Sequence, residues 1–418
     1  MARNGAPKFF YGYIVALAAF LIMVVTWGAF YSFGVFFKPV LTEFGWTRAA
    51  TSGAYSLSFV LSGFIGIFAG RLSDRLGPRI VMTGCGLFLG LGYLLMSQVN
   101  AIWQLYLFNG VIVGIGLSGA YVPAISTVSR WFVRRRGLMT GIVVAGIAAG
   151  TMVIPPVANW LISSYGWRTS YNIIGIIVLV LMILAAQFLR RDPSQMGLSP
   201  YGEGEVEQES LNLEARGFSL QRAIHTGQFW MLCVMFLCFE FCVNTIMVHI
   251  VPHATDLKIS AASAVNILAI IGGLGVAGRI IMGSAGDRIG NKLAITTCFI
   301  LMSAALLWLL ATKELWMFYL FAVIFGFAYG GYSPLISLMV AELFGLSSLG
   351  VILGAVTFSL TIGAAIGPTL AGRIFDITSS YQPAFLVCAG FSIIAIILAL
   401  FLKPITNAGR QDDLRRST

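Results

Sequence analysis

The sequence predicts an all-α membrane protein with twelve transmembrane helices in two pseudo-symmetric six-helix bundles. Hydrophobic residues make up 58% of the 418 residues and charged residues only 10%, so the chain could not cover itself with a polar surface in water. The apolar residues form unbroken runs of about twenty, the length at which a helix crosses a bilayer, whereas barrel strands are shorter and alternate. Because lipid offers the backbone no hydrogen bonds, these runs must be helices.

Twelve apolar runs are long enough to cross the membrane. The first is too long for a signal-peptide core and has no clear cleavage site after it, so we expect it to remain in the protein. The predicted spans are residues 10–37, 50–70, 80–98, 102–129, 138–163, 170–189, 227–255, 261–282, 292–312, 316–343, 350–375 and 382–403.

The basic residues predict the orientation of the chain. With both termini inside, nineteen of the 26 Lys and Arg residues fall in cytoplasmic segments, as the positive-inside rule requires. We therefore expect a multi-pass protein of the cytoplasmic membrane, surrounded by lipid, with both termini in the cytoplasm. The net charge of +10 then reflects topology and not nucleic-acid binding. The basic residues outside are Lys38, Arg48, Arg168, Lys258 and Lys313, while Arg279 and Arg373 lie within spans.

One long polar stretch, residues 190–226, separates the sixth and seventh spans. We expect it to be a cytoplasmic linker between an N-terminal bundle at 1–189 and a C-terminal bundle at 227–403, which a cytoplasmic tail at 404–418 follows. The stretch is too short to bury the core of a catalytic domain. Its acidic run consists of Glu203, Glu205, Glu207 and Glu209.

The sequence contains no arrangement that is typical of an enzyme. No Ser/His/Asp or metal-binding constellation lies at the predicted membrane faces, so we expect no catalysis and no cofactor. All six Cys residues lie inside apolar spans without metal-ligand spacing, and we expect them to be small buried hydrophobic side chains. They are Cys85, Cys233, Cys238, Cys242, Cys298 and Cys388.

A loop pattern occurs twice in the chain. Residues 70–79, GRLSDRLGPR, and residues 283–292, GSAGDRIGNK, share G-x-x-x-D-R-x-G-x-[RK] at an offset of 213 positions. Each copy follows the second span of its half and precedes the third, so it marks a short basic cytoplasmic loop. The two halves are copies of one unit, which is how transporters with a central, two-fold site are built.

The repeat extends into the helices. Tyr121 begins YVPAIS in the fourth span, and Tyr332 begins YSPLIS in the tenth. These two tyrosines could close over a substrate from the two halves, or their hydroxyl groups could bond across helices. In the first span Trp27, Tyr31 and Lys38 share one helical face, which we expect to line the pathway. Lys38 either attracts anions to the outer entrance or only extends to the membrane surface.

The doubled loop motif, the twelve spans and the constant offset resemble the major facilitator superfamily over essentially the whole chain. In that family the Asp and Arg of the loop help to hold the two halves together on the cytoplasmic side. The resemblance therefore implies that Asp74 with Arg75, and Asp287 with Arg288, are gate residues and not substrate ligands. A carboxylate near helix N-termini and guanidinium groups forms charge-assisted bonds that can break and re-form.

Further motifs resemble the monocarboxylate transporter and oxalate:formate antiporter branch of that superfamily. Residues 131–146, WFVRRRGLMTGIVVAG, are similar to its fifth-helix signature, and residues 367–381 are similar to its eleventh helix. Arg279 is similar to the branch's substrate-binding arginine, and the resemblance implies a bacterial lactate-type proton symporter. Two departures prevent its proton-handling scheme from being carried over: Gly275 replaces the expected eighth-helix aspartate, and Tyr31 the first-helix lysine.

Arg279 is also a candidate for substrate binding on its own chemistry. An arginine near the middle of an apolar span costs roughly 3 kcal/mol on insertion scales, so it should face a cavity and a partner. Gly272 and Gly275 lie on the same helix face and leave room beside the guanidinium for a small planar carboxylate. The alternative is a permanent ion pair with Glu240 or Asp256.

The seventh span carries the other ionisable groups. His249, His253 and Asp256 share one helical face, Glu240 lies nearly opposite them, and we expect Pro252 to break the helix between them. We favour Asp256 as the proton-linked carboxylate near the outer mouth, with His249, His253 and Glu240 as further candidates. The alternatives are a solvated Asp256 in a loop and a His249 that only forms hydrogen bonds within the bundle.

Together these patterns predict a secondary active transporter that moves a small monocarboxylate anion, such as L-lactate or pyruvate, with a proton by alternating access. We expect it to act as a monomer. An anion exchanger of the oxalate:formate type is the main alternative, because it needs a cation in the cavity but no titrating carboxylate. A membrane sensor that keeps the fold without transport is a weaker alternative, since the polar segments are short and contain no signalling domain.

Overall fold

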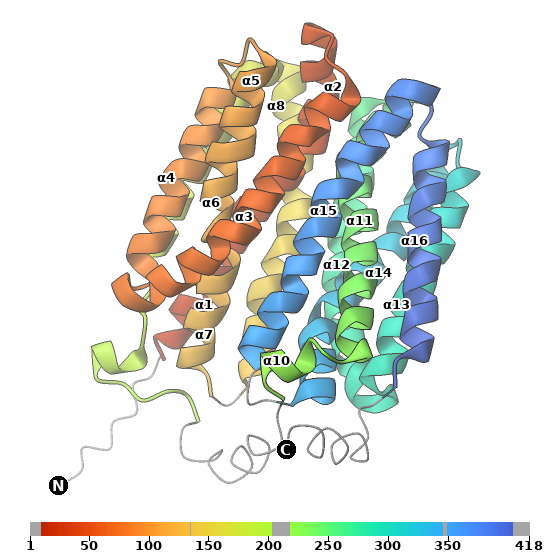
Figure 1. Cartoon of the computed structure of the whole chain (residues 1–418). Helices are drawn as coiled ribbons and strands as arrows, with labels where there is room; N and C mark the ends of the chain where they lie inside the picture. The colour runs from red at the N-terminus through yellow and green to blue at the C-terminus, as the bar shows by residue number, and fades with distance from the viewer. Residues whose placement is uncertain (1–9, 134, 203–217, 346–348, 404–418) are drawn as a thin grey trace, which may run out of the picture. The chain divides into compact units, whose positions relative to one another are not determined.

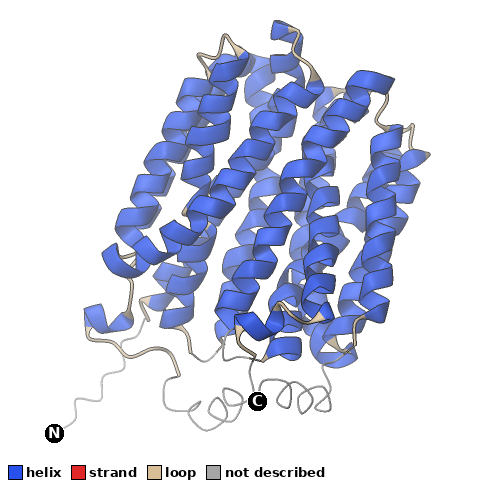
Figure 2. Cartoon of the chain, viewed as in Figure 1, coloured by secondary structure: helices blue, strands red, loops and turns tan. Residues whose placement is uncertain are grey.

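The computed structural model describes residues 10–133, 135–202, 218–345 and 349–403, and Figures 1 and 2 show them as helices joined by short loops. Apart from one isolated bridge between Phe132 and Tyr201, the described residues form no β-structure. The predicted all-α class is therefore confirmed. Arg134, the predicted acidic run at 203–209 and the predicted tail at 404–418 lie outside the described residues.

The chain divides into two compact units. Unit 1 consists of Met1–Trp46 and Gly53–Glu207. Apolar residues that continue over several turns form its long helices, and Pro78 begins α4 at a position where its missing N–H costs nothing. The helices of unit 1 are α1 (Gly12–Tyr31), α2 (Phe33–Phe44), α3 (Arg48–Leu76, from Gly53 onward), α4 (Pro78–Met96), α5 (Ile102–Leu105), the π-helix η1 (Tyr106–Val113), α6 (Gly114–Ser118), α7 (Tyr121–Trp131), α8 (Arg136–Gln187) and the short η2 (Pro193–Met196).

Unit 2 consists of Thr47–Ser52 and Gln208–Thr418, so the first turn of α3 belongs to it and not to unit 1. Side-chain caps begin three of its helices, where Ser219, Thr226 and Ser260 each accept a hydrogen bond from a backbone N–H of the first turn. The remaining helices of unit 2 are α10 (Leu220–Ala223), α11 (Gly227–Asp256), α12 (Ala261–Ile289), α13 (Asn291–Leu310), α14 (Leu315–Phe344), α15 (Leu349–Thr378) and α16 (Gln382–Phe401).

The described residues contain eleven stretches that are long and apolar enough to cross a membrane. The sequence predicts twelve spans, and the difference lies in α8, which runs through two predicted spans over 52 residues. Inside α8, Gly166 has φ 77° and ψ 160°, a conformation that no helix contains and that glycine adopts without strain. Gly166 therefore separates the fifth and sixth spans, and the predicted twelve-span architecture is confirmed.

Glycine residues let helices approach closely within each unit. In unit 2, a Cβ atom on Gly330 of α14 would overlap the carbonyl group of Gly275 in α12. In unit 1, a Cβ atom on Gly150 of α8 would overlap the carbonyl oxygen of Val24 in α1. Small residues at such crossings are the usual means by which helices pack in lipid, where no hydrophobic force drives them together.

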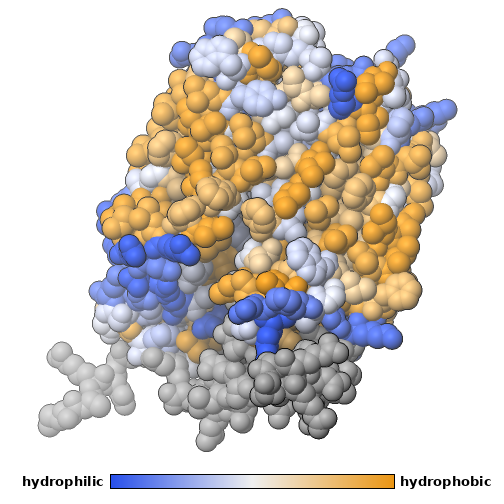
Figure 3. Space-filling view, in the orientation of Figure 1, coloured by the Kyte–Doolittle hydropathy of each residue, from blue (hydrophilic) through white to orange (hydrophobic). Residues whose placement is uncertain are grey.

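Large apolar side chains cover the outward sides of the helices. In α16, Leu400 is 59% exposed and Phe401 65% exposed, and in α8 Trp160 is 60% exposed. Figure 3 shows hydrophobic side chains along the lengths of the helices and hydrophilic ones mainly near their ends. An exposed apolar surface of this extent is stable only where lipid surrounds it.

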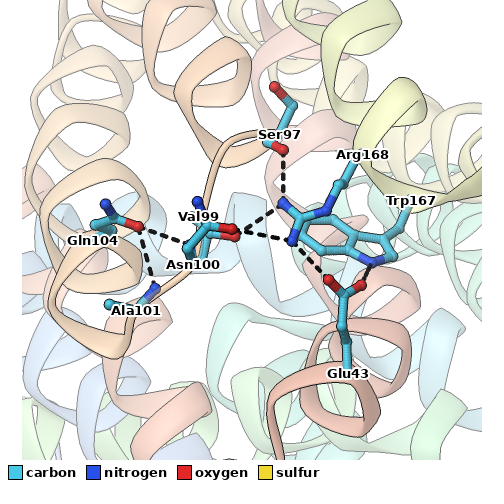
Figure 4. Close-up of polar contacts among 8 residues, drawn as sticks. All are labelled: Glu43, Ser97, Val99, Asn100, Ala101, Gln104, Trp167 and Arg168. Carbon is cyan, nitrogen blue, oxygen red and sulfur yellow. Dashed lines mark hydrogen bonds and ion pairs between the residues drawn. The ribbon is translucent and has the colours of Figure 1, made fainter.

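A hydrogen-bonded network joins three segments of unit 1 (Figure 4). Arg168, two residues after Gly166, donates from Nη1 to the carbonyl oxygens of Ser97 and Val99, each at 2.9 Å, and from Nη2 to Glu43 at 2.6 Å. The second carboxylate oxygen of Glu43 accepts from the indole of Trp167 at 2.6 Å. The guanidinium of Arg168 is thus well supplied with acceptors.

Candidate functional site

Arg279 is a buried cation, and two of its nitrogens lack a hydrogen-bond acceptor among the described residues. It lies in α12 and is 8% exposed. Among the residues that the structure describes, none accepts a hydrogen bond from its Nε or Nη1 atoms, and its guanidinium carbon lies 5.5 Å from the ring centre of Tyr329. Arg168, by contrast, donates hydrogen bonds to four acceptors. A buried guanidinium without acceptors is unfavourable unless an anion binds to it.

Glu240 of α11 is the acidic candidate that interacts electrostatically with Arg279. Its carboxylate is within electrostatic range of the guanidinium, yet within the described part of the chain the two form no ion pair at or below 4.0 Å. Instead, Oε2 of Glu240 accepts a hydrogen bond from Nδ2 of Asn244 at 2.8 Å. Asp256, the other expected partner of Arg279, pairs with Arg48 at 2.7 Å.

Aromatic rings lie beside Glu240 and Arg279. Tyr332 of α14 is 2% exposed, and its ring stacks on Phe239 of α11 with the centroids 3.6 Å apart. The Tyr332 hydroxyl also lies close to Glu240. Helices α11, α12 and α14 therefore bring together Glu240, Arg279 and Tyr332, three of the residues singled out in the sequence, next to an aromatic surface. A cation, an acid and stacked rings in one buried place suit a small organic anion.

The expectation that Pro252 breaks its helix is wrong. Helix α11 continues through Pro252 to Asp256, where the N–H of Leu257 donates to the carbonyl oxygen of His253 at 3.2 Å. A proline removes only its own N–H from the helical ladder, and the buried packing of this segment supports the remaining bonds. His249, His253 and Asp256 consequently stay on one face of α11, as the helical period requires.

That face of α11 meets a second group of polar residues. The ring of His253 packs edge-on against Tyr381 with centroids 5.7 Å apart, and Nδ1 of His249 lies 3.0 Å from the Tyr381 hydroxyl. The Tyr381 hydroxyl accepts a hydrogen bond from Nη1 of Arg48 at 2.6 Å. Burial raises the pKa of Tyr381, although Arg48 opposes this, so the phenol keeps its proton. This second group of polar residues thus consists of Arg48, His249, His253, Asp256 and Tyr381.

Arg48 was not expected in any site. In the sequence it is only one of the basic residues predicted to lie outside. Its guanidinium carbon lies 3.5 Å from the ring centre of Phe375, and its nitrogens bind Asp256 and Tyr381. The signal that could have found it is indirect, because Asp376 and Tyr381 lie in the segment that resembles the eleventh helix of the related branch.

The predicted pathway residues of the first and fourth spans lie in unit 1. The indole N–H of Trp27 is buried and has no acceptor among the described residues. Its ring lies 5.7 Å from that of Tyr31, which ends α1 and is 4% exposed. Tyr121 begins α7 and is 36% exposed, and Lys38 lies half-buried in α2. Within unit 1, the first span therefore offers one buried donor beside a set of aromatic rings.

The predicted gate residues are described only in part. Asp74 accepts a hydrogen bond from Nη2 of Arg130 at 2.5 Å, and Arg130 also lies 3.9 Å from Asp192. Arg130 in α7 is thus a partner that sequence reasoning did not name. Arg75 and Arg288 are exposed. The side chain of Asp287 lies outside the described residues.

No metal site is found in the part of the chain that the structure describes, where no three His, Cys, Asp or Glu side chains come together. The six cysteines are buried and unpaired with one another, as small hydrophobic residues would be.

Comparison with known proteins assigns the chain to a family. The Major Facilitator Superfamily matches at residues 19–296 and 254–417. Monocarboxylate transporter 12 of Rattus norvegicus is 28% identical over 94% of this chain and 85% of its own length, and monocarboxylate transporter 13 of the same species is 27% identical over 99% and 95%. A crystal structure of a bacterial homologue of the human lysosomal transporter Spinster has the same fold, with a TM-score of 0.69, 18% identity and 95% of each chain covered. The twelve spans and the family match together show that the chain belongs to the Major Facilitator Superfamily and is a membrane transporter, not an enzyme.

Proposed function

We propose that this transporter carries a small monocarboxylate, such as L-lactate or pyruvate, together with a proton by alternating access. The observation that carries the proposal is Arg279, a buried guanidinium with two nitrogens that lack acceptors among the described residues. A carboxylate supplies the charge and the acceptor atoms that such a group needs. The relatives named monocarboxylate transporters support the same class of substrate.

The charge balance around Arg279 favours a monoanion. Glu240 already places one carboxylate within electrostatic range of the guanidinium. A dianion would bring a second negative charge to this position, and among the described residues no second cation forms an ion pair there. The stacked rings of Tyr332 and Phe239 suit a short apolar tail on the anion.

Proton coupling follows from the energetics of moving an anion. Uptake of a monoanion against a membrane potential of ~100 mV costs about 2.3 kcal/mol per charge, and a proton that travels with it cancels the charge. We propose Asp256, whose side chain is 27% exposed, as the proton-linked carboxylate, with Glu240 as the alternative and His249 and His253 as secondary candidates. Substrate and proton then bind cooperatively, because each compensates the charge of the other.

An anion exchanger of the oxalate:formate type is the second candidate. It is favoured by the segment 131–146, which is similar to both kinds of transporter, and by the fact that exchange needs Arg279 but no titrating group. The two functions differ in what drives accumulation, either a proton gradient or a counter-anion.

The test is uptake of radiolabelled L-lactate into proteoliposomes, with and without an inward proton gradient, for the wild type and Arg279→Ala. Gradient-driven uptake that the substitution abolishes supports the symporter. Uptake that ignores the gradient but requires an anion loaded inside supports the exchanger. Absence of both activities over a panel of small carboxylates would reject the proposed substrate class.

A further inference from the structure

His249 ends a continuous chain of hydrogen bonds that starts at Arg48. His249 is fully buried, at 0% exposure. Its Nε2 atom lies 2.8 Å from the carbonyl oxygen of Pro368 in α15, and its Nδ1 atom lies 3.0 Å from the hydroxyl oxygen of Tyr381. Nη1 of Arg48 lies 2.6 Å from that same hydroxyl oxygen. Three groups that are far apart in the sequence therefore form one bonded series.

The direction of each bond follows from the chemistry of the groups. A carbonyl oxygen only accepts, so Nε2 of His249 must carry a hydrogen and donate it to Pro368. A guanidinium only donates, so the oxygen of Tyr381 accepts from Arg48 and its own hydrogen is directed elsewhere. In a neutral imidazole, Nδ1 then holds the lone pair that accepts the Tyr381 hydrogen.

Arg48 is itself held in place from several sides. Nη2 pairs with Asp256 at 2.7 Å, and the backbone N–H groups of Arg48 and Ala49 donate to the two oxygens of Asp376, each at 2.9 Å. Gly372 of α15 lies so close that a Cβ atom there would come within 2.8 Å of the backbone of Arg48 and Ala49. The guanidinium is thus oriented by α11 and α15 and has little freedom to turn away from Tyr381.

We propose that Arg48 is a positioning residue that acts through Tyr381 to keep Nδ1 of His249 unprotonated, while the carbonyl group of Pro368 holds the hydrogen of the neutral imidazole on Nε2. The proposal rests on the transport function proposed above, in which His249 is a candidate proton group. The charged and titratable groups around the series are Arg48 from α3, His253 and Asp256 from α11, Asp376 from α15, and Tyr381 before α16.

This arrangement has a mechanistic consequence. While Arg48 donates to Tyr381, the lone pair of His249 Nδ1 is occupied and a proton can bind there only after the Tyr381 hydrogen turns away. Withdrawal of Arg48 would let the Tyr381 hydrogen turn away from His249, so that Nδ1 could bind a proton and then donate it to the Tyr381 oxygen. The position of Arg48 would therefore decide whether His249 offers or lacks a free lone pair.

The tautomer can be observed directly, because the chain contains only three histidines. The full-length protein, labelled with ¹⁵N-histidine and reconstituted in lipid nanodiscs, gives ring nitrogen signals that separate N–H from lone-pair nitrogens, and His249→Gln assigns the signals of His249. We expect one tautomer in the wild type, with the hydrogen on Nε2 and a hydrogen-bonded Nδ1. A hydrogen on Nδ1 in the wild type would overturn the proposal.

Substitutions then separate positioning from general structure. Arg48→Met keeps the length of the side chain but removes its donors, and Tyr381→Phe removes the hydroxyl. Each should shift the Nδ1 signal of His249, and Arg48→Met should cause no further shift in the Tyr381→Phe background, because the effect passes through the hydroxyl. Additive shifts, or an unchanged signal in Arg48→Met, would reject the relay. Arg48→Lys retains a donor, so the Nδ1 signal of His249 should stay close to its wild-type position in this variant.

Two controls account for indirect effects. Asp256→Asn removes the charge but keeps an oxygen that can accept from Nη2 of Arg48, so Arg48 should stay in place and the Nδ1 signal of His249 should persist. Arg168→Met removes a different arginine in unit 1 and should leave the His249 signals unchanged. A change of tautomer in either control would indicate a global rearrangement and count against the relay.

Lactate uptake by the same variants tests whether the positioning of His249 matters for transport. Arg48→Met should lower the uptake rate at low lactate concentration about tenfold, the effect of one lost buried hydrogen bond, with partial recovery in Arg48→Lys. The tautomer measurement needs no transported substrate. A wild type that takes up none of a panel of small carboxylates therefore rejects the proposed function, whereas an unchanged Nδ1 signal of His249 in Arg48→Met rejects the positioning role alone.

Discussion

Asp376 of α15 caps the first turn of α3. Its two carboxylate oxygens accept the backbone N–H groups of Arg48 and Ala49, each at 2.9 Å. Helix caps usually come from the residue just before the helix, whereas this one lies 328 positions away from Arg48. Gly372, one turn before Asp376, admits the backbone of α3 at this point. The capping carboxylate thereby anchors Thr47–Ser52 in unit 2.

We predict that Asp376→Ala lowers stability by about 1 to 2 kcal/mol, because two N–H groups lose a charged acceptor. Asp376→Asn should cost less, since one amide oxygen can still accept one of the two bonds. The measurement is the thermal midpoint of the purified protein in nanodiscs. Equal midpoints for the wild type and Asp376→Ala would show that this cap does not contribute to stability.

Gly330→Ala should disrupt the crossing of α12 and α14. The added Cβ atom would overlap the carbonyl group of Gly275, so the helices must separate and Arg279 and Tyr332, which they carry, must move apart. We expect a stability loss of about 1 to 3 kcal/mol together with a loss of uptake. The matched control is Gly354→Ala, where no atom lies within 4 Å of the new methyl group and stability should be unchanged or slightly raised.

Arg279 should matter for transport more than for folding. We expect Arg279→Ala to lower the uptake efficiency for L-lactate about 100-fold, because a charge-assisted pair with the substrate is lost. Arg279→Lys should recover only part of it, since an ammonium lacks the planar fork of a guanidinium. Kinetics in proteoliposomes measure the effect. Thermal stability of the variants should not fall, because the substitution removes a buried guanidinium whose Nε and Nη1 atoms lack acceptors among the described residues. A large loss of stability in Arg279→Ala with normal uptake by the folded fraction would instead point to a structural arginine.

Asp256→Asn distinguishes proton coupling from anion exchange. If Asp256 carries the proton, the variant should lose accumulation driven by an inward proton gradient but still exchange external for internal lactate. The paired experiment is Glu240→Gln, which removes the other carboxylate from the same helix. Gradient-driven uptake that survives in Asp256→Asn but disappears in Glu240→Gln would transfer the role to Glu240, and survival in both would exclude both residues.

The membrane architecture could be predicted because the bilayer prescribes it. A helix that crosses lipid must be apolar over about twenty residues, and Gly227–Asp256 and Gln382–Phe401 begin where the hydropathy of the sequence places them. Arg279 was recognisable for the same reason, since a lone charge within an apolar span stands out in the sequence. The hydropathy of a span and the cost of a charge within it depend only on that segment and on the lipid around it.

The partners of charged residues depend on the folded chain. Arg48 meets Asp256, Asp376 and Tyr381, all more than 200 positions away, and Asp74 meets Arg130 from a different helix. The continuation of α11 through Pro252 likewise rests on its packing and not on local propensity. Sequence alone determined which segments enter the membrane, because hydropathy acts residue by residue. The tertiary structure alone decided which polar groups meet, because hydrogen bonds act over about 3 Å and depend on how helices pack.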